Sequence, residues 1–533
     1  LDIDLDAVPK KYDGLNGTEL AISESQERMA VVVRKKDARA FIDLAAKENL
    51  RAVVVAKVTG TNRLVMKWRG KTIVDLSRDF LDAAGAPHKA RAYIENPALP
   101  ETSPLVRPLE SAAKKLPSSL SDAWLANIND LACCSERGLS ERFDGSIGSA
   151  TVLFPFGGKY QRTPEAAMAA KIPVASPRET STASMMSFGF DPFVGEWSAW
   201  HGAQTAVLSS LAKIVCIGGN AASCRLSFQE YFGRAVDEKT WGYPAAALLG
   251  ALEAQKKTGC ASIGGKDSMS GTFENINVPH TLVSFAVTHD EAKLVTSGSF
   301  KKSGSAIYFV GTPYSPLLAP DFTAFMQNAA ILYRLNARGA IRAMYPVGSG
   351  GIAEALTKMM MGNGIGSRID AVPLSFTRAH IPGAKASSLD LFTPQYGSII
   401  FEAAPEAESE IDKAGFVSGT IFKIGETIRE SEIVVEDEHA GIPHTKISLS
   451  DAEKAWESKL SKVFPPVSES PALPALPSFA LAAHPSLADL RSCVSLGKKS
   501  FAAPTKKVRV LIPVFPGTNC EYDSARAWER VGA

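Results

Sequence analysis

The chain has 533 residues, of which 45% are apolar and 21% charged, a composition typical of an ordinary globular protein with room for about three domains. Its formal net charge of +2 gives no support to a dedicated nucleic-acid or membrane-surface protein. No apolar run is long enough to span a bilayer, and the acidic, polar first residues do not resemble a signal peptide. We therefore expect a cytoplasmic protein with no nucleic-acid or membrane partner.

The cysteines argue against a metal or disulfide framework. The seven cysteines contain no Cys-x-x-Cys pair, and the eight histidines do not cluster with them. A structural zinc site needs such spacing, so we expect free thiols in a reducing compartment.

Strands and helices are expected to alternate before Gly85. Apolar runs predict strands at Ala30–Arg34, Ala52–Val58 and Arg63–Trp68. The spacing of Phe41, Leu44 and Ala45 predicts a helix over residues 38–48. Ser77 is expected to cap a short helix that ends at Gly85.

A similar order of elements recurs over residues 391–458. The comparison starts from Gln26 in the first copy and Gln395 in the second, which are 369 residues apart (395 − 26 = 369). Counted from these residues, Lys57 and Lys423 each end a corresponding apolar run. This pattern predicts an internal repeat, with two similar halves packed as a pseudo-dimer. The alternative is the general likeness of α/β modules.

The segment between the two copies, about 118–290, has a different pattern. It predicts helices near residues 202–216 and from Pro244 to Thr258, with Pro244 at the start and Gly259 at the end of the second. A strand at Ser305–Val310 opens the second copy. Residues 464–505 carry seven prolines and predict a linker.

The last residues predict a strand, Lys507–Phe515, followed by a helix over Cys520–Val531. A lone βα unit cannot bury its apolar faces, so we expect a domain that begins at about residue 507 to be incomplete here. Cys520 near a helix N-terminus can have a lowered pKa. It has no histidine or acidic partner from its own domain, so we do not expect it to be a nucleophile.

The stretch Ser262–Gly271 (SIGGKDSMSG) is expected to form a loop. It is not a Walker A loop, because Asp267 follows Lys266 where serine or threonine is needed. The N–H groups of Gly264 and Gly265 can face a phosphate, Lys266 can neutralise it, and Asp267 can hold Mg²⁺. A solvated turn is the alternative.

Two further stretches contain residues that suit the binding of a phosphate or a polar substrate. The loop Val347–Gly351 opens a helix over Ile352–Met361, and Gly350 and Gly351 at a helix N-terminus suit phosphate binding. A tight strand-to-helix turn is the alternative. In Ser23–Met29, Ser25 and Gln26 can hydrogen-bond a polar substrate and Arg28 can pair with a phosphate or carboxylate. The alternative is a solvated charged segment.

Six stretches, in order, resemble the large single-chain form of phosphoribosylformylglycinamidine synthase: GLNGTELAISESQERM, RFDGSIGSATVLFPFGGKYQ, FGFDPF, CRLSFQEYF, IGGKDSMSGTF and FPGTNCEYD. Together they extend over most of residues 14–533. The resemblance implies a carbon–nitrogen ligase of purine biosynthesis. Such an enzyme uses ATP to activate formylglycinamide ribonucleotide, and glutamine-derived ammonia then gives formylglycinamidine ribonucleotide, ADP, phosphate and glutamate.

The resemblance also implies the fold, an α+β and α/β protein built like aminoimidazole ribonucleotide synthetase. Ferredoxin-like A domains and mixed αβ B domains are duplicated and then followed by a class I glutamine amidotransferase domain. The expected parts are the end of the first B domain (1–117), the second A domain (118–290), the second B domain (300–463), a Pro-rich linker (464–506) and the start of the glutaminase (507–533). The implied partners are the missing N-terminal synthetase and C-terminal glutaminase parts.

By position in these motifs, the resemblance implies substrate-binding residues Glu24, Ser25, Gln26, Arg28 and Ser268; nucleotide-binding residues Gly264, Gly265, Lys266, Gly350 and Gly351; and Asp267 as a ligand of Mg²⁺. It assigns no catalytic residue.

Three departures from the family pattern weaken an auxiliary nucleotide–metal site. Lys266 stands where smaller relatives have asparagine, and Ser209 and Lys213 stand where some bacterial relatives have metal ligands. No aspartate directly precedes Gly350. A protonated lysine cannot ligate Mg²⁺, but it can take the metal's place as a fixed cation.

Two other hypotheses remain. The chain can be a non-catalytic scaffold half of the same enzyme, inactive alone. It can also be another ATP-using synthetase, of the selenophosphate or hydrogenase-maturation type. FPGTNCEYD argues against the second, because those enzymes carry no glutaminase.

Overall fold

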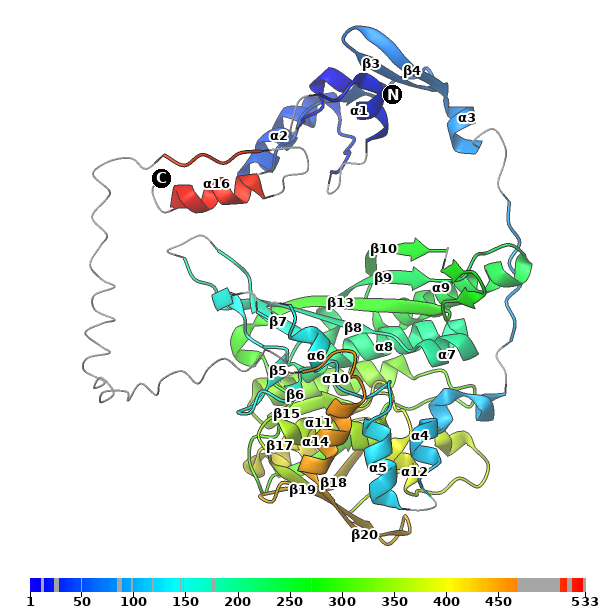
Figure 1. Ribbon diagram of the computed structural model, residues 1–533, viewed down its shortest axis with the longest axis vertical. Coiled ribbons are helices and arrows are strands. Elements are labelled where there is room, and N and C mark those ends of the chain that lie inside the picture. The colour runs from blue at the N-terminus through cyan, green and yellow to red at the C-terminus, as the bar shows by residue number, and fades with distance from the viewer. Residues whose placement is uncertain are drawn as a thin grey trace, which may run out of the picture. The chain divides into compact units, whose positions relative to one another are not determined.

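The computed structural model (Figure 1) describes the whole chain except residues 11–13, 24–27, 49, 84–88, 97–98, 117–118, 144, 147, 175–177, 270, 467–508, 515–519 and 531–533. The chain forms two compact units, one of Leu1–Lys89 with Pro471–Ala533 and one of Ala90–Ser470. Each unit is described by itself.

The first unit contains a four-stranded sheet in the order β2-β1-β3-β4. Its strands are β1 (Asp2–Asp4), β2 (Ala56–Lys57), β3 (Arg63–Trp68) and β4 (Lys71–Ser77), and its helices are α1 (Gly17–Ile22), α2 (Ala38–Lys47), α3 (Arg78–Ala83) and α16 (Glu521–Arg530). β1 runs antiparallel to β2 and parallel to β3, and β3 and β4 form a hairpin.

Several predictions for this unit are confirmed. The helix over 38–48 and the strand at 63–68 are present, and Ser77 Oγ accepts a hydrogen bond of 3.2 Å from the Phe80 N–H as a cap of α3. The helix after Cys520 is present as α16. Gly85 and most of the 464–505 linker lie outside the described residues.

Three predicted strands in this unit are wrong or too long. Residues 30–34 and 509–514 pair with no strand in the described part of the chain. Of the strand predicted at 52–58, only Ala56–Lys57 forms a strand, which is β2. Val31 and Val32 are exposed. An apolar run forms a strand only where a neighbouring strand supplies hydrogen bonds, and these two runs have no such neighbour among the described residues.

In the second unit, two helices cover one face of a five-stranded sheet in the order β10-β9-β13-β8-β7 (Figure 1). The strands are β7 (Met168–Lys171), β8 (Thr182–Gly189), β9 (Arg225–Tyr231), β10 (Ser262–Ser268) and β13 (Thr281–Glu291). The covering helices are α8 (Ala199–Cys216) and α9 (Glu238–Thr258), and α7 (Pro192–Trp197) precedes them.

The helix α8 lies in the core of this unit. Nearly all its side chains are buried, and it packs on β8 and β13 while also contacting β15 (Ile341–Pro346) of a second sheet. Gly189 on β8 permits this close approach, because a Cβ there would lie 2.7 Å from the Ser210 nitrogen. Small residues on both elements therefore bring the helix close to the strand.

The helix α9 begins at Glu238, so the predicted start at Pro244 is wrong. Asp237 and Thr240 form a capping box that supplies the first hydrogen bonds of the helix, and Pro244 lies inside it. The predicted end is confirmed, because Gly259 follows the last turn with a φ of 74°.

A seven-stranded sheet follows in the order β15-β17-β14-β18-β16-β19-β20. Its strands are β14 (Ala306–Val310), β15 (Ile341–Pro346), β16 (Gly366–Ile369), β17 (Ile399–Ala403), β18 (Ile421–Ile428), β19 (Glu432–Asp437) and β20 (Ile442–Ser448). The remaining helices are α4 (Glu110–Ala113), α5 (Leu120–Ile128), α6 (Arg137–Ser140), α10 (Phe322–Ala337), α11 (Gly351–Met361), α12 (Leu389–Phe392), α13 (Glu408–Asp412) and α14 (Leu449–Ser458). Short hairpins join β5 (Phe156–Gly157) to β6 (Thr163–Pro164) and β11 (Thr272–Phe273) to β12 (Ile276–Asn277).

Both faces of this sheet are buried at β14. Alternate residues of β14 belong to two different cores. Tyr308 and Val310 lie in the core that includes α10. Ile307 and Phe309 lie in the core that includes α11. The strand therefore has the continuous apolar sequence expected of a two-sided strand.

The predicted internal repeat appears in the sheet topology. β18-β16-β19-β20 has the same order and orientations as β2-β1-β3-β4, with one antiparallel pair, one parallel pair and one hairpin. Arg63 and Glu432, which begin β3 and β19, are 369 residues apart (432 − 63 = 369). The pseudo-dimer and the domain boundaries remain predictions.

Candidate functional site

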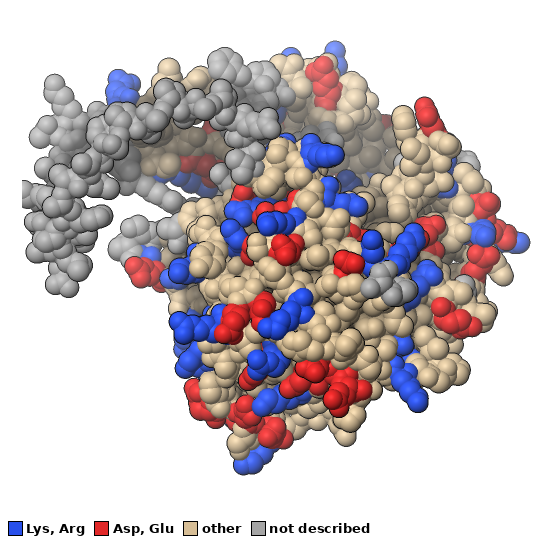
Figure 2. Space-filling view, turned by 60° about the horizontal axis from the view of Figure 1, so that its bottom comes forward, with Lys and Arg blue, Asp and Glu red and all other residues tan. Residues whose placement is uncertain are grey.

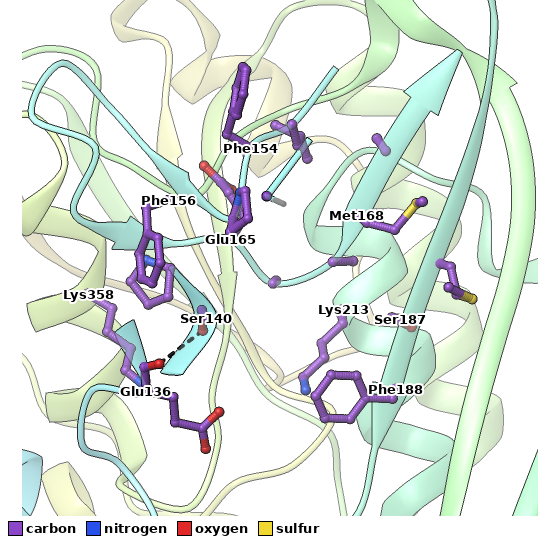
Figure 3. Close-up of a pocket in the computed structure, with 18 of the residues that line it drawn as sticks. Glu136, Ser140, Phe154, Phe156, Glu165, Met168, Ser187, Phe188, Lys213 and Lys358 are labelled. Carbon is purple, nitrogen blue, oxygen red and sulfur yellow. Dashed lines mark hydrogen bonds between the residues drawn. The ribbon is translucent and has the colours of Figure 1, made fainter. Parts of the chain in front are cut away.

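A cavity of about 650 Å³ lies within the second unit (Figure 3). Residues from 131–169, β8, α8 and α11 line it, and aromatic side chains form much of its wall: Phe154, Phe156, Phe188, Phe285 and Trp456. A mostly apolar cavity with a few polar groups has the size and character of a small-molecule site.

Lys213 is a charged side chain of this wall and comes from the otherwise apolar helix α8. Its Nζ lies 4.4 Å from the centre of the Phe188 ring, and Figure 3 shows the two side chains next to each other. Burial, together with the nearby Lys358 charge, lowers the pKa of Lys213 to about 8. Among the described residues no carboxylate forms an ion pair with it.

Lys358 on α11 has a different environment. It forms an ion pair with Glu354, one turn earlier on the same helix. Burial opposes the charged form, but the Glu354 carboxylate outweighs that effect and raises the pKa of Lys358. The cavity therefore contains one neutralised and one unneutralised lysine.

Glu165 lies at another part of the wall. Its Oε2 accepts a hydrogen bond of 2.9 Å from the Gly298 N–H, whereas its Oε1 is buried without a partner among the described residues. Burial raises the pKa of Glu165 to about 7. Burial also raises the pKa of the Cys133 thiol, so this cysteine is not a reactive thiolate.

The stretch Ser262–Ser268, expected to be a loop, is the edge strand β10. It pairs in parallel with β9, with a bulge between Ser262 and Gly265 where Gly264 has a φ of 158°. β9 offers the hydrogen-bond partners that turn a polar, glycine-rich sequence into a strand. Gly264, Gly265, Lys266 and Asp267 are all exposed on this edge.

Glu230 is the residue opposite Asp267 on β9, and sequence reasoning missed it. Its side chain is only 6% exposed, and its Oε1 has no hydrogen-bond partner among the described residues. Burial, with the nearby Asp267 charge, raises the pKa of Glu230 to about 7. A glutamate at a core position of the alternating strand after Leu226 and Phe228 is the signal that could have found it.

The Gly350–Gly351 turn leaves few free N–H groups. The Gly350 N–H donates to Glu354 Oε2 at 2.8 Å, and the Gly351 N–H donates to the Gly348 carbonyl at 3.2 Å. These two amides are already bonded within the protein, so the geometry gives no support to phosphate binding by them.

The predicted site residues lie in different parts of the chain. Glu24, Ser25 and Gln26 lie outside the described residues, and Arg28 is exposed in the first unit. Within the second unit, β10 lies at one edge of the five-stranded sheet, while β7 at the other edge contributes Met168 and Ala169 to the cavity. The cavity and the β10 edge are therefore separate sites.

The two sites fit a metal ion differently. The described residues contain no group of three or more His, Cys, Asp or Glu side chains placed to hold a metal. Mg²⁺ commonly binds through one or two carboxylates and a substrate phosphate, which Asp267 and Glu230 can provide. The cavity wall carries the carboxylates of Glu136 and Glu165 together with Lys213 and Lys358, whose ammonium groups do not ligate metals.

Basic and acidic side chains are interspersed over the face drawn in Figure 2. None of the described helices is long and apolar enough to cross a membrane.

Comparisons with known proteins identify relatives. A family described as AIR synthase related protein, C-terminal domain, matches residues 1–69. The chain is 25% identical over 480 residues to the phosphoribosylformylglycinamidine synthase subunit PurL of Thermoplasma volcanium, and 23% identical over 492 residues to that of Cutibacterium acnes. Each match covers 86% of this chain but 59% of the relative, so the chain spans well under two thirds of their length.

A solved structure agrees in fold. T. maritima PurL complexed with FGAR matches with a TM-score of 0.50 at 18% identity, over 80% of this chain and 57% of that one. With these matches, the resemblance seen in the sequence is confirmed: the chain is a relative of the PurL subunit of phosphoribosylformylglycinamidine synthase and has a mixed α/β fold of the AIR synthase type.

Proposed function

We propose that this chain supplies part of a purine-biosynthetic ligase that converts formylglycinamide ribonucleotide to formylglycinamidine ribonucleotide. The observation that carries the proposal is the match to PurL subunits over 86% of the chain. T. maritima PurL has been solved in complex with FGAR and in complex with ATP, and these are the substrate and nucleotide that we assign to this chain. Glutamine-derived ammonia is the nitrogen donor, and the cytoplasm is the expected compartment.

The β10 edge is the part of the second unit that we assign to the reacting groups. Lys266 and the N–H groups around Gly264 and Gly265 are exposed and can meet phosphate oxygens, and Ser268 can hydrogen-bond the substrate. Phosphoryl transfer depends mainly on positioned positive charge, which a lysine on a paired strand can provide. We assign the substrate ribonucleotide to Glu24, Ser25, Gln26 and Arg28, as the sequence predicts.

Asp267, with Glu230 opposite it, would hold Mg²⁺ at this edge. The ion would neutralise charge on the nucleotide phosphates when bound. Asp267 is the outer, solvent-facing ligand, whereas Glu230 offers an oxygen that no described group occupies.

A non-catalytic scaffold is the second candidate. It is favoured by the bonded state of the Gly350 and Gly351 amides, which removes one of the two predicted phosphate loops. Under this alternative the chain supports folding and substrate passage for the N-terminal synthetase and C-terminal glutaminase parts without its own phosphate chemistry.

The two candidates are separated by an assay of ADP release from Mg-ATP with formylglycinamide ribonucleotide and ammonium chloride, which bypasses the glutaminase. We expect no substrate-dependent release from the chain alone and restored release when a chain with the remaining N-terminal synthetase part is added. In the restored mixture, Asp267→Asn is expected to lower the rate at least tenfold.

The matched control is Asp82→Asn, which removes the charge of an exposed aspartate of α3 that pairs with Arg78. It should leave the rate unchanged. Restored release that is insensitive to Asp267→Asn would support the scaffold instead. No release in the restored mixture would count against the ligase proposal.

A further inference from the structure

The helix α9 has apolar side chains on its solvent-facing side as well as on its packed side. A helix on the surface of a globular protein normally buries one face and carries polar residues on the other. The inner face of α9 packs on α8 and α10. The outer face carries four large apolar side chains that are 39% to 54% exposed: Trp241, Leu248, Leu249 and Leu252.

These side chains form a continuous stripe. Trp241, Ala245, Leu248 and Leu252 follow one another at intervals of four, three and four residues, which places them on one face of the helix. Leu249 lies beside this row. Single exposed apolar residues are common on protein surfaces, but a contiguous apolar patch marks an interaction surface.

The segment before α4 widens the patch. Tyr93 and Ile94 are 59% and 42% exposed. The Tyr93 N–H donates a hydrogen bond of 2.7 Å to the Glu238 carbonyl, so this segment lies against the first turn of α9. The apolar surface is therefore broader than one row of helix side chains.

Opposite charges lie at the two ends of the same face. Glu238 and Lys256 are 18 residues apart (256 − 238 = 18), which is five turns of about 3.6 residues, so both point along the stripe. The ion pair of Glu238 with Arg91 is long, at 3.8 Å. Among the described residues no carboxylate forms an ion pair with Lys256. The face is thus acidic at one end, apolar in the middle and basic at the other end.

Such a face is complementary to a copy of itself that runs in the opposite direction. A twofold axis at residue 247 places Glu238 of one copy against Lys256 of the other, because (238 + 256)/2 = 247. The same axis passes through the middle of the stripe, because (241 + 252)/2 = 246.5. One register therefore satisfies both the charges and the apolar contacts, as a self-complementary twofold interface requires.

The size of the side chains also suits this arrangement. Ala245 lies close to the axis, where two helices 8–10 Å apart need small residues to approach each other. Trp241 then packs near Leu252 of the second copy at each end of the contact. A parallel pair would instead bring like charges together at both ends of the stripe.

We propose that the outer face of α9 is a docking surface for a second copy of this chain, and that the two helices pack antiparallel with Glu238 of each copy against Lys256 of the other. This association needs no substrate or nucleotide. It is measured without turnover, so it and the proposed function can fail separately.

Sedimentation velocity of the full 533-residue chain tests the proposal. Between about 1 and 100 µM, a range that suits a modest interface, the mass should rise from 56.8 kDa towards twice that value. Leu248→Glu puts a charge in the apolar contact and should weaken the dimer at least tenfold. The matched control is Leu44→Glu, at a leucine of α2 that is 59% exposed, and it should change the dimer by less than about twofold.

Charge reversal tests the antiparallel register. Glu238→Lys and Lys256→Glu should each weaken the dimer at least fivefold, because both ends of the contact then bring like charges together. An equal mixture of the two variants should recover dimers, because in the mixed pair each end joins a lysine to a glutamate. Loss of helix stability in either variant cannot produce this recovery.

The outcomes decide the proposal. A chain that stays monomeric at about 100 µM, or a dimer that Leu248→Glu and Leu44→Glu weaken equally, would overturn it. A dimer that forms through α9 but is not recovered in the mixture would overturn the antiparallel register. Circular dichroism on heating shows that each variant is folded, and if Leu248→Glu does not fold, the mixture of the two charge variants still tests the surface.

Discussion

Glu354 Oε2 accepts a hydrogen bond of 2.8 Å from the backbone N–H of Gly350, and the same carboxylate pairs with Lys358 one turn further along α11. One largely buried side chain thus caps the helix and neutralises a lysine of the cavity wall. The Gly350 amide that sequence reasoning assigned to a phosphate is occupied by this carboxylate. The Glu354 carboxylate therefore supplies the negative charge that is favourable at the N-terminus of α11.

Removing Glu354 should therefore be costly. Glu354→Ala leaves Lys358 as an unpaired buried charge, and breaking a buried pair costs about 3–5 kcal/mol. Urea unfolding monitored by circular dichroism measures the loss. Asp43→Ala breaks an exposed i,i+4 pair with Arg39 on α2 and should cost at most about 1 kcal/mol. Equal losses in the two variants would show that Lys358 finds another partner.

Glu230 should make stability depend on pH near neutrality. Burial raises its pKa in the folded protein to about 7, above the value of about 4.3 in an unfolded chain. Between these values the folded state holds more protons, so stability falls as pH rises from about 4.3 to 7. At about 1.4 kcal/mol per pKa unit, the loss is as much as about 4 kcal/mol.

Glu230→Gln removes this contribution. Its advantage over wild type should be small at pH 5 and largest at pH 8, measured by urea unfolding at both values. Glu179→Gln, at an exposed position, should show no such change between the two pH values. If the advantage of Glu230→Gln is the same at pH 5 and pH 8, Glu230 is not titrating in this window.

Sequence reasoning predicted those elements whose signals are local. The helix over 38–48 and the strand at 63–68 have their periodicity and caps within a few residues, and the repeat shows in element order. β10 was missed because glycine, lysine and aspartate resemble a turn until β9 lies alongside. The strand predicted at residues 30–34 is absent for the opposite reason, because its valines have no neighbouring strand among the described residues.

The cavity depends on contacts that no local pattern encodes. Lys213 and Lys358 are far apart in the chain and line the same cavity because α8 packs between the two sheets while α11 lies on the seven-stranded one. The sequence marked Lys213 as a departure from the family pattern, but its partner Phe188 and the orphaned Glu165 oxygen appear only in three dimensions.

Lys213 should also make the free energy of unfolding depend on pH. Its folded pKa of about 8 lies below the value of about 10.4 in an unfolded chain. Between these values the unfolded chain holds more protons, so stability rises with pH across the window. Lys213→Met should be more stable than wild type at pH 7, and up to about 3 kcal/mol of that advantage should vanish by pH 10.

Guanidinium unfolding of both proteins at pH 7 and pH 10 measures this difference, and other groups that titrate in the window cancel in the comparison. Lys257→Met provides the reference for an exposed lysine. A constant difference between Lys213→Met and wild type would mean that the ammonium group is solvated in the folded protein.

Gly351 is expected to be the least replaceable glycine of the α11 turn. Its φ is 68°, and a Cβ there would lie 2.5 Å from the Leu391 carbonyl oxygen and 2.7 Å from the Phe392 carbonyl carbon. Gly304 has a similar φ of 79°, but a Cβ would meet nothing within 4 Å. The left-handed conformation alone costs an alanine about 1–2 kcal/mol.

Gly304→Ala should therefore lose about 1–2 kcal/mol of unfolding free energy, while Gly351→Ala should lose at least about 3 kcal/mol, because backbone atoms cannot move aside as side chains do. Urea unfolding of both variants at one pH gives the comparison. Since the turn also positions the Gly350 N–H on Glu354, Gly351→Ala should weaken the Lys358 ion pair as well. Equal losses in the two alanine variants would show that the backbone of residues 391–392 moves to accommodate the added Cβ. Packing against these residues would then not determine the conformation of the turn.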